Sequence, residues 1–479
     1  MTATLWTLLI VQIAMGLFDT VWHHEGTERL AWRPSQRREL QLHGVRNLAY
    51  AVLFVCLGWA EAHGAWAWAL GALLLGELFI TLWDFVEEDR TRLLPATERV
   101  THTLLTLNYG AFLALFVPVM AGWAAQPSAI VPSDQGALKW LCLIAAIGVI
   151  ISGMRDLAAA ARSPHLTDAP AAALAEALEP GRTVLVTGGT GFVGQRLVQA
   201  LVAAGHAVIV LTRRPDKAGL PGPVRTVAAL DEIAAETRID AIVNLAGEPL
   251  ANGLWTQAKR ARIIASRLSV TEACLALVER LETRPTVLVS ASAIGWYGLR
   301  GDEVLDEGSD GRDCFSREVC VAIEAAASRG EALGLRTVRL RIGLVLDRAG
   351  GLLGRMLTPF EFGLGGPFGR GKHWMSWIHR DDLVRLICHA IADPEMSGAV
   401  NATAPQPVTN RDFTRALGKA LRRPAVLPVP AWPLTAVLGD FARELLLGGQ
   451  RVVPTAAQRS GFVFRYPALD EALAAICGK

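Results

Sequence analysis

Residues 183–194 read Thr-Val-Leu-Val-Thr-Gly-Gly-Thr-Gly-Phe-Val-Gly, and this stretch decides the fold of the chain. An apolar run typical of a buried strand ends at a glycine turn, and the apolar pattern over residues 192–204 predicts a helix directly after it. In such a turn Gly188 allows the tight bend, Gly191 lets a pyrophosphate approach the backbone, and Gly194 lets the helix pack closely on the strand. The helix N-terminus offers free N–H groups and a positive dipole end to phosphates. We therefore expect a dinucleotide here, bound by Gly188, Gly189, Thr190, Gly191, Phe192, Val193 and Gly194.

The second predicted strand, residues 207–211, indicates which dinucleotide to expect, because Thr212-Arg213-Arg214 follows it. An acidic residue at this place would accept hydrogen bonds from the ribose hydroxyls of NAD, whereas an arginine suits the 2′-phosphate of NADP. The sequence favours NADP bound by Arg213 and Arg214 and leaves NAD open. The alternative is that both arginines belong to a solvated loop.

Further apolar strands follow at residues 241–245, 286–290 and 337–342, separated by helical patterns such as 256–280 and 317–333. This alternation predicts an α/β fold, a Rossmann-like doubly wound parallel sheet. Ligands of such sheets bind at the carboxyl ends of the strands. The residues expected there are Ala246, Gly247, Ser290, Ser292 and Gly343.

The composition excludes some classes of protein. A net charge of +2 gives no reason to expect a nucleic-acid partner, and a length of 479 residues suggests two or three domains. The seven cysteines show no CxxC pair and no zinc spacing, which is typical of reduced thiols in a cytosol-facing protein.

Five apolar stretches precede the glycine turn and predict an all-α transmembrane domain over residues 1–156, in contact with membrane lipid. The first lacks a basic leader and a cleavage site, so it reads as an uncleaved anchor, and the last is short for a span. The stretches are 4–22, 45–62, 64–85, 103–123 and 138–154.

Charge asymmetry predicts the orientation of these spans. Arginines gather in the first and third connections, whereas residues 61–63 and 126–136 carry neither Lys nor Arg. By the positive-inside tendency, the N-terminus lies outside and the nucleotide domain lies in the cytoplasm, as in an integral protein of a cell inner membrane.

Carboxylates and imidazoles also gather at the predicted cytoplasmic ends of the spans. Glu39 and His43 share one helix face, as do Glu98 and His102, and these four residues are the candidate ligands of an iron, manganese or zinc ion. The alternative is that such groups pair with the nearby arginines. Glu77 lies about two turns inside its span, where ionisable groups are usually functional or paired.

Residues 182–477 resemble the atypical short-chain dehydrogenase/reductases of the epimerase-like kind, related to the NAD-dependent epimerase/dehydratase family. The segments that carry the resemblance are TGGTGFVG, NLAGEP, SASAIGWYG, RIGLVL and WIHRDDLV, together with a C-terminal part that resembles the small closing domain of that family. The expected organisation is a linker over 157–180, a nucleotide-binding domain over 181–400 and the small domain over 401–479.

The resemblance implies an altered active site. Ordinary members combine a Ser with a Tyr and a Lys on the following helix; Ser292 matches the Ser, but Ser316 and Cys320 stand at the other two positions. A serine is a far weaker acid than a phenol, and a thiol is not a fixed cation. Tyr297 offers a phenol nearby, or else packs behind its turn, and Cys320 is either a working thiol or a packed helix residue. Arg267 stands where ordinary members place an Asn, which suggests a ribose or substrate contact.

Residues 351–379 have the composition of a substrate lid, with a glycine-rich cationic loop leading into aromatic residues. Arg370 and Lys372, with Arg355, would hold a phosphate or carboxylate. The loop leads into His373, Trp374, Trp377 and His379, and the tryptophans would form an apolar wall. The alternative is a surface loop followed by core aromatics.

Two functions therefore remain in view. One is a membrane-anchored, cytoplasm-facing, NADP-dependent oxidoreductase or epimerase, whose small-molecule substrate is either lipophilic or delivered at the membrane. The other is a non-catalytic NADP(H)-binding redox sensor coupled to the membrane domain. The absent Tyr and Lys favour the sensor, whereas Ser292 and the lid favour the enzyme. The sequence leaves both the substrate and homo-oligomer formation open.

Overall fold

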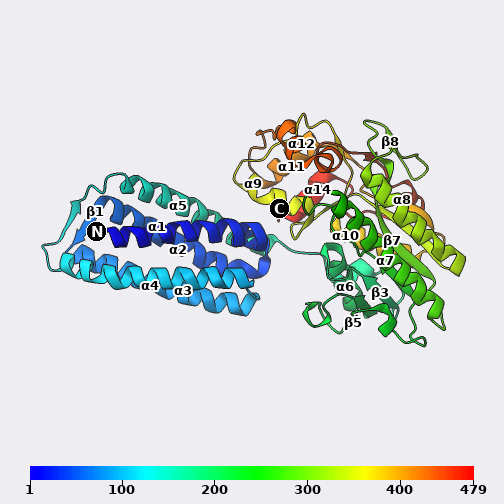
Figure 1. Ribbon diagram of the computed structural model, residues 1–479, viewed down its shortest axis with the longest axis horizontal. Coiled ribbons are helices and arrows are strands. Elements are labelled where there is room, and N and C mark those ends of the chain that lie inside the picture. Colours follow the sequence, from blue (N-terminus) through cyan, green and yellow to red (C-terminus); the bar gives the residue numbers. More distant parts are fainter. Residues whose placement is uncertain (479) are drawn as a thin grey trace. The chain divides into compact units, whose positions relative to one another are not determined.

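The computed structural model describes residues 1–478, which form two compact units, Met1–Thr167 and Asp168–Cys477 (Figure 1). The boundary falls within the range expected to be a linker. Residues 157–162 instead continue the last helix of the first unit, and the short helix Ala171–Ala175 packs on helix α6 (Phe192–Ala203) of the second. Residues 401–477 belong to the same unit as residues 181–400.

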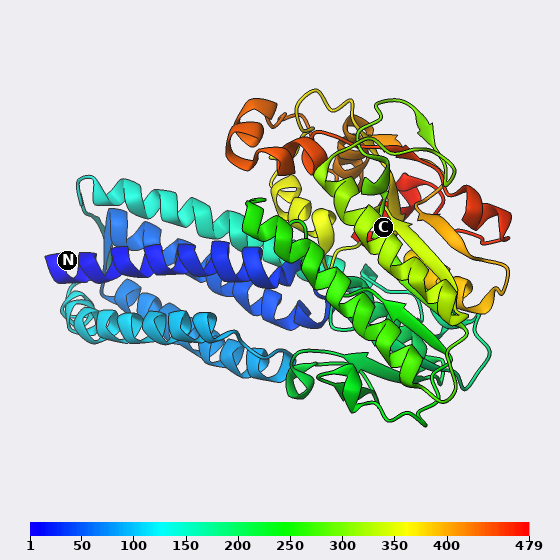
Figure 2. The ribbon, with the colours of Figure 1, turned by 45° about the vertical axis from the view of Figure 1, so that its right-hand side comes forward.

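The first unit contains five long helices. They run alongside one another as a bundle (Figures 1 and 2). Each is long and apolar enough to cross a membrane, and the fifth, expected to be short, extends to Arg162. Short strands β1 (Ala60–His63) and β2 (Ala129–Pro132) pair antiparallel. The helices are α1 (Ala3–Phe18), α2 (Arg37–Trp59), α3 (Ala65–Thr91), α4 (Ala96–Ala124) and α5 (Leu138–Arg162).

Two features shape this bundle. Residues Asp19–Glu28 continue α1 as a wide π-helical segment, η1, a form that often occurs at functional sites. Helices α2 and α5 cross with their backbones nearly in contact, because a Cβ on Gly44 would lie 3.0 Å from the carbonyl oxygen of Gly153. Close crossings at small residues are typical of membrane helices. Large apolar side chains such as Trp68 and Phe79 face outward, 72% and 75% exposed.

The second unit is built on a seven-stranded sheet of order β13-β9-β7-β6-β3-β4-β5, with every neighbouring pair parallel. This confirms the predicted Rossmann-like doubly wound α/β fold. The strands are β3 (Thr183–Thr187), β4 (Ala207–Leu211), β5 (Arg225–Val227), β6 (Ala241–Asn244), β7 (Val287–Ala293), β9 (Arg336–Ile342) and β13 (Gly398–Ala402).

The sheet is buried on both faces, which explains why its strands read as continuous apolar runs. Val184 and Val186 pack with helices α6 (Phe192–Ala203) and α10 (Arg380–Ala392), whereas Leu185 packs on the opposite face with α7 (Gln257–Arg280) and α8 (Phe315–Ser328). The sheet edge at the carboxyl ends of the strands is therefore framed by helices from both layers.

The remaining elements lie outside the main sheet and complete the second unit. The helices are α9 (Gly351–Glu361), α11 (Asn410–Leu421), α12 (Ala431–Leu438), α13 (Thr455–Arg459) and α14 (Leu469–Cys477). The short strands are β8 (Val304–Leu305), β10 (Leu344–Leu346), β11 (Trp374–Met375), β12 (Trp377–His379), β14 (Val408–Thr409) and β15 (Arg451–Val452).

Candidate cofactor and active site

The glycine turn after β3 forms an open cradle at the N-terminus of α6. Gly188 has a φ of +70°, which favours glycine, and a Cβ on Gly194 would overlap the carbonyl oxygen of Gly188. Gly191, the N-cap residue of α6, has no side chain to cover the first N–H groups of the helix. Thr190 and Gly191 are exposed, so a phosphate can reach these groups. The residues present therefore fit a dinucleotide pyrophosphate.

The turn lies between the carboxyl ends of β3 and β6. Here the strand order changes direction, because β4 and β5 follow β3 on one side and β7, β9 and β13 follow β6 on the other. A Cβ on Gly188 would lie 2.8 Å from the carbonyl carbon of Leu245, so the two strand ends approach very closely. Thr187 donates its hydroxyl to Asn244 Oδ1 (2.6 Å), and the Asn244 amide donates to Thr271 Oγ1 (3.0 Å). This buried chain of hydrogen bonds holds the two strand ends and places Ala246 beside the cradle. The sequence analysis did not identify these positioning residues.

Arg213 and Arg214 follow β4 at the same edge of the sheet. Both are exposed, and neither forms an ion pair with a carboxylate of residues 1–478. Their position after the second strand is the one from which a cation reaches the adenosine ribose in this fold.

Arg267 extends from α7 to the residues that follow β6. It donates from Nη1 to the carbonyl oxygens of Glu248 (2.8 Å) and Ile263 (3.0 Å), and its side chain leaves no room for a Cβ on Gly247. Burial lowers the pKa of this guanidinium. Arg267 is thus a half-buried cation at the edge where the ligand is expected.

Ser292 and Cys320 lie together at the end of β7. Ser292 is 8% exposed and donates its hydroxyl to Glu324 Oε1 at 2.8 Å, whereas Cys320 donates to the carbonyl oxygen of Ala293 at 3.4 Å. Burial raises the pKa of Cys320 to about 11, because the ionised thiolate is disfavoured away from water. Cys320 is therefore a neutral thiol near pH 7, which supports its interpretation as a packed helix residue. Ser290 is buried deeper in the same strand.

Glu324 belongs to a buried network that the sequence analysis missed. Its carboxylate binds the Arg341 guanidinium at two points, 2.9 Å and 3.0 Å, and Arg341 donates to the Tyr297 hydroxyl at 3.1 Å. Tyr297 is completely buried, donates to Asn401 Oδ1 at 2.7 Å, and has a pKa raised to about 12 by burial. This corrects the catalytic assignment of Tyr297, because its phenol is held inside the fold. The local signal was the spacing of Glu324, one helical turn after Cys320.

Ser316 stands where the resemblance implies the catalytic Tyr of ordinary short-chain dehydrogenases, and it is hydrogen-bonded to Glu444 in the C-terminal segment. Its hydroxyl donates to Glu444 Oε2 at 2.6 Å, and its backbone N–H donates to the same oxygen at 2.9 Å. The N–H of Phe315 donates to Glu444 Oε1 at 3.2 Å. Glu444 thus caps the first turn of α8, where a carboxylate is favoured by the helix dipole.

The expected lid divides into an exposed and a buried part. Arg370 and Lys372 are exposed on the loop after α9, as a substrate-binding role requires. His373 is half-buried, and burial lowers its pKa to about 4, whereas Trp374 donates to Asp302 at 2.7 Å. Trp377 is completely buried and belongs to the core, so the wall of tryptophans is incomplete.

Two hydrogen bonds of Arg355 link helix α9 to the loop that follows β6. Arg355 on α9 donates to Asn252 Oδ1 at 3.0 Å and to the carbonyl oxygen of Ala251 at 3.3 Å. The loop after β6 and the helix α9 are thereby connected at the surface of the unit.

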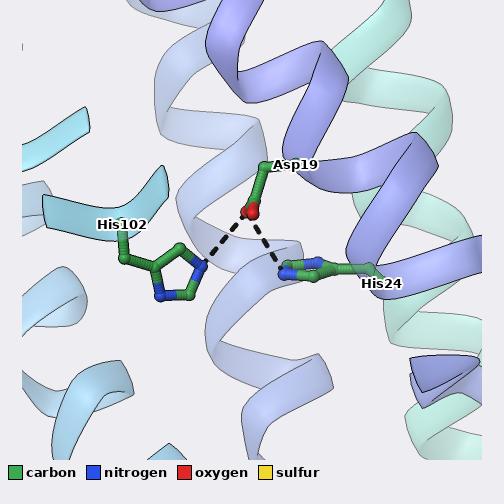
Figure 3. Close-up of side chains that lie close together, drawn as sticks. All are labelled: Asp19, His24 and His102. Atoms are coloured by element: carbon green, nitrogen blue, oxygen red, sulfur yellow. Dashed lines mark hydrogen bonds and ion pairs between the residues drawn. The ribbon is translucent and has the colours of Figure 1, made fainter. Parts of the chain in front are cut away.

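The four candidate metal ligands all lie in the first unit, but they fall into two groups, Glu39 and His43 with Glu88, and Glu98 and His102 with Glu88. Glu39 and Glu98 both bind the Arg92 guanidinium, at 3.0 Å and 2.7 Å. These two carboxylates therefore follow the alternative stated above, in which such groups pair with nearby arginines. His43 lies 2.9 Å from Asp84 Oδ2. His102 contacts Asp19, and His24 lies on the other side of the same carboxylate (Figure 3).

Comparison with known proteins links the second unit to a described family. Residues 184–402 match the NAD dependent epimerase/dehydratase family, and residues 429–476 match a domain of unknown function. A chloroplastic Arabidopsis thaliana homolog of epimerase family protein SDR39U1 is 42% identical over 307 residues, covering 62% of this chain and 87% of the relative.

Two solved structures are also similar. The human epimerase family protein SDR39U1, determined with NADPH, is 35% identical with a TM-score of 0.56, covering 62% of this chain and 99% of that one. A nucleoside-diphosphate sugar epimerase from Corynebacterium glutamicum is 33% identical with a TM-score of 0.51, covering 68% of this chain and 63% of that one.

Proposed function

The chain belongs to the epimerase family that includes SDR39U1, and on this premise we propose that it is a membrane-anchored, NADP-dependent oxidoreductase or epimerase. The observation that carries the proposal is the open cradle of Gly188–Gly194, with Arg213 and Arg214 at the same edge of the sheet. The NADPH in the human relative supports the choice of cofactor.

The exposed arginines after β4 support NADP over NAD. The cradle would hold the pyrophosphate through backbone N–H groups, and Arg213 would bind the 2′-phosphate through a charge-assisted hydrogen bond. Arg267 offers a second cation near the strand ends, for a phosphate or a ribose hydroxyl. When bound, the nicotinamide would supply hydride transfer.

The chain's own groups then have limited roles in the reaction. Ser292 is the one hydroxyl of the ordinary mechanism still at its place, and it would donate to a substrate oxygen as negative charge develops there. Cys320 is a neutral thiol, and the Ser316 hydroxyl donates its hydrogen bond to Glu444. Neither residue therefore replaces the Tyr and Lys that transfer the proton in ordinary members of the family. Arg370 and Lys372 would attract an acidic group of the substrate.

The same observations favour a second candidate function. A cofactor cradle beside a site whose two proton-handling positions are occupied by Ser316 and Cys320 is what a non-catalytic NADP(H) sensor requires. Turnover distinguishes the two functions, because the sensor binds NADPH without oxidising it.

Five apolar helices with outward-facing aromatic and aliphatic side chains support membrane anchoring. The arginine-rich connections support an N-terminus outside and a cytoplasmic cofactor unit, as in a cell inner membrane. A site tethered in this way suits a small lipophilic substrate that reaches it from the bilayer. Self-association of the chain is compatible with this arrangement.

The test uses the full chain purified in detergent. NADPH and NADH affinities are measured by cofactor fluorescence, and NADPH oxidation is followed with a panel of lipophilic aldehydes and ketones. We expect NADPH to bind at least about tenfold more tightly, since a charge-assisted hydrogen bond contributes roughly 1.5–3 kcal/mol.

The variant Arg213→Ala should remove most of that preference and leave NADH binding unchanged. Arg238→Ala is the matched control, because Arg238 pairs with Asp240 at the amino edge of the sheet. Equal affinities in the parent protein would contradict the NADP assignment, and tight NADPH binding without any turnover would favour the sensor.

A further inference from the structure

The first unit contains a buried group of carboxylates that an apolar bundle does not need for packing. All five are 6% exposed or less, and they converge from four helical segments. Burying ionised carboxylates in an apolar bundle is costly unless cations compensate for them. These residues are Asp19, Glu39, Asp84, Glu88 and Glu98.

Two arginines compensate for part of this charge. Arg92 Nη2 lies 2.7 Å from Glu98 Oε1, and it also contacts Glu39 (3.0 Å) and Glu88 (3.5 Å). Arg46 Nη1 lies 2.8 Å from Asp84. Five carboxylates therefore face two guanidinium groups, and Asp19 is bound by neither.

The Oδ2 oxygen of Asp19 is instead faced by two imidazoles (Figure 3). Asp19 Oδ2 lies 3.3 Å from His24 Nε2 and 3.2 Å from His102 Nε2. His24 Nε2 is buried, and among the described residues it has no hydrogen-bond partner, although Glu98 Oε1 lies 3.8 Å away. His24 Nε2 therefore lies in ion-pair range of two carboxylates without a hydrogen bond to either, so this buried nitrogen is available to a ligand placed beside the three groups.

The spacing of these three atoms suits a metal ion. Ligands bound at about 2.0–2.1 Å in tetrahedral geometry lie roughly 3.3 Å apart. The Asp19, His24 and His102 donor atoms all lie within 4.8 Å of one another, and two of the separations are 3.2 Å and 3.3 Å. Two imidazoles and one carboxylate form a ligand set used for divalent transition metals.

The outer partners of these ligands support the same conclusion. His102 turns its other nitrogen, Nδ1, toward Glu88 Oε2 at 3.4 Å, and Asp19 turns its other oxygen toward His23 Nδ1 at 2.9 Å. His24 is stacked on His43, with ring centroids 4.7 Å apart. Such partners orient metal-bound imidazoles and carboxylates and select the tautomer that leaves a nitrogen free for the ion.

We propose that Asp19 Oδ2, His24 Nε2 and His102 Nε2 bind a first-row divalent transition-metal ion, with Glu98 beside the open coordination position. The site lies entirely within the first unit and is independent of the cofactor cradle. The competing account is that protonated histidines alone balance the carboxylates.

The experiment uses the full chain, purified in detergent with its affinity tag removed. Cells are grown with added iron, manganese or zinc, and bound metal is counted by elemental analysis. We expect about one ion per chain from one of these metals, retained through dialysis and removed by a chelator. Adding Co²⁺ to the chelated protein should restore occupancy and produce a visible absorption band.

Two variants remove ligands with little change in side-chain size, Asp19→Asn and His24→Gln. Each should lower metal content by about tenfold or more and abolish the Co²⁺ band. His63→Gln is the matched control, because His63 is a buried histidine of the same unit that pairs with Glu61 at β1. It should retain the metal.

NADPH binding, measured on the same samples, should be unchanged in all three variants, which separates this proposal from the proposed function. Parent protein that holds no metal and gives no Co²⁺ band would overturn the metal site, as would His24→Gln protein with full metal content. The Co²⁺ spectrum of the parent decides the question even if a variant fails to fold.

Discussion

Ser292 Oγ donates a hydrogen bond of 2.8 Å to Glu324 Oε1, so the serine beside the expected nicotinamide is already held by a carboxylate. A substrate oxygen must therefore compete with Glu324 for the serine proton. The pairing also fixes the serine rotamer, which prepares the hydroxyl for a ligand that enters next to it.

For an enzyme, Ser292→Ala should lower NADPH turnover by about 10²–10³, the usual effect of removing one hydrogen-bond donor to a developing oxyanion. NADPH affinity should stay within about twofold, because the phosphates are held by the glycine turn and not by this hydroxyl. Steady-state kinetics and cofactor titration on the same preparation measure the two effects. Undiminished turnover across the substrate panel would remove Ser292 from the active site.

Glu324→Gln should destabilise the second unit by about 3–5 kcal/mol, because it leaves the buried Arg341 cation without its carboxylate. The double variant Glu324→Gln/Arg341→Met should recover much of this loss, since neither charge is then buried alone. Hydrogen–deuterium exchange of β7 and β9 measures the change in opening free energy. Equal protection in the single variant and the parent would mean that the pair contributes little.

Gly194→Ala should abolish NADPH binding and destabilise the second unit by about 1–3 kcal/mol or more, because the added Cβ overlaps the Gly188 carbonyl and forces α6 away from the turn. The matched control is Gly308→Ala, whose Cβ would lie 3.6 Å from Asp306 Oδ1, an ordinary contact. Cofactor titration compares the two. Normal binding by Gly194→Ala would show that the cradle is not the pyrophosphate site.

Acid should loosen α10, because burial lowers the pKa of His379 from 6.5 to about 4. The neutral ring accepts the Asp381 N–H at 3.1 Å and caps the helix. Between pH 6.5 and 4 the unfolded state binds the proton and the folded state does not. The stabilisation is therefore complete above pH 6.5 and is lost toward pH 4, by about 3 kcal/mol in total.

Hydrogen–deuterium exchange of α10 peptides against pH measures this effect. The variant His379→Asn keeps a capping oxygen but does not titrate, so its profile should be flatter. Some slope should remain, because burial also lowers the pKa of His373 to about 4. Identical profiles for variant and parent would contradict the assignment to His379.

Topology reporters test the proposed orientation in the membrane. Fusions after Ala65 and after Ser128 should report the outside, whereas fusions after Pro34, Pro95 and Lys479 should report the cytoplasm. The expected pattern follows from the arginines in the first and third connections. A C-terminal fusion that reports the outside would overturn both the number of spans and the location of the cofactor unit.

The fold was predictable from the sequence because its signals are local. The apolar runs of β3, β4 and β6, the glycine turn and the five apolar helices are each legible within a short window. The altered positions Ser316 and Cys320 followed from the resemblance to the short-chain dehydrogenase/reductases, which implies where the Tyr and the Lys would stand. The limits of the first unit's last helix were less clear, since small residues replace large apolar ones beyond residue 154.

The partners of the site residues could not be predicted, because they come from distant parts of the chain. Glu324 lies 32 residues from Ser292, and Glu444 lies 128 residues from Ser316, so no local pattern links them. The same is true of Asp19, which contacts His102 across 83 residues. Periodicity identifies the face on which a residue lies, but pairing across elements depends on how the helices pack.

Glu444 caps helix α8, and this contact limits which fragments of the second unit can be expressed on their own. Glu444 belongs to the stretch matched by the second family model, and α8 belongs to the stretch matched by the first. A fragment that ends after β13 would leave the first turn of α8 without its counter-charge, at the helix that carries Ser316 and Cys320. A recombinant fragment of this unit therefore has to contain both matched stretches, residues 184–402 and 429–476.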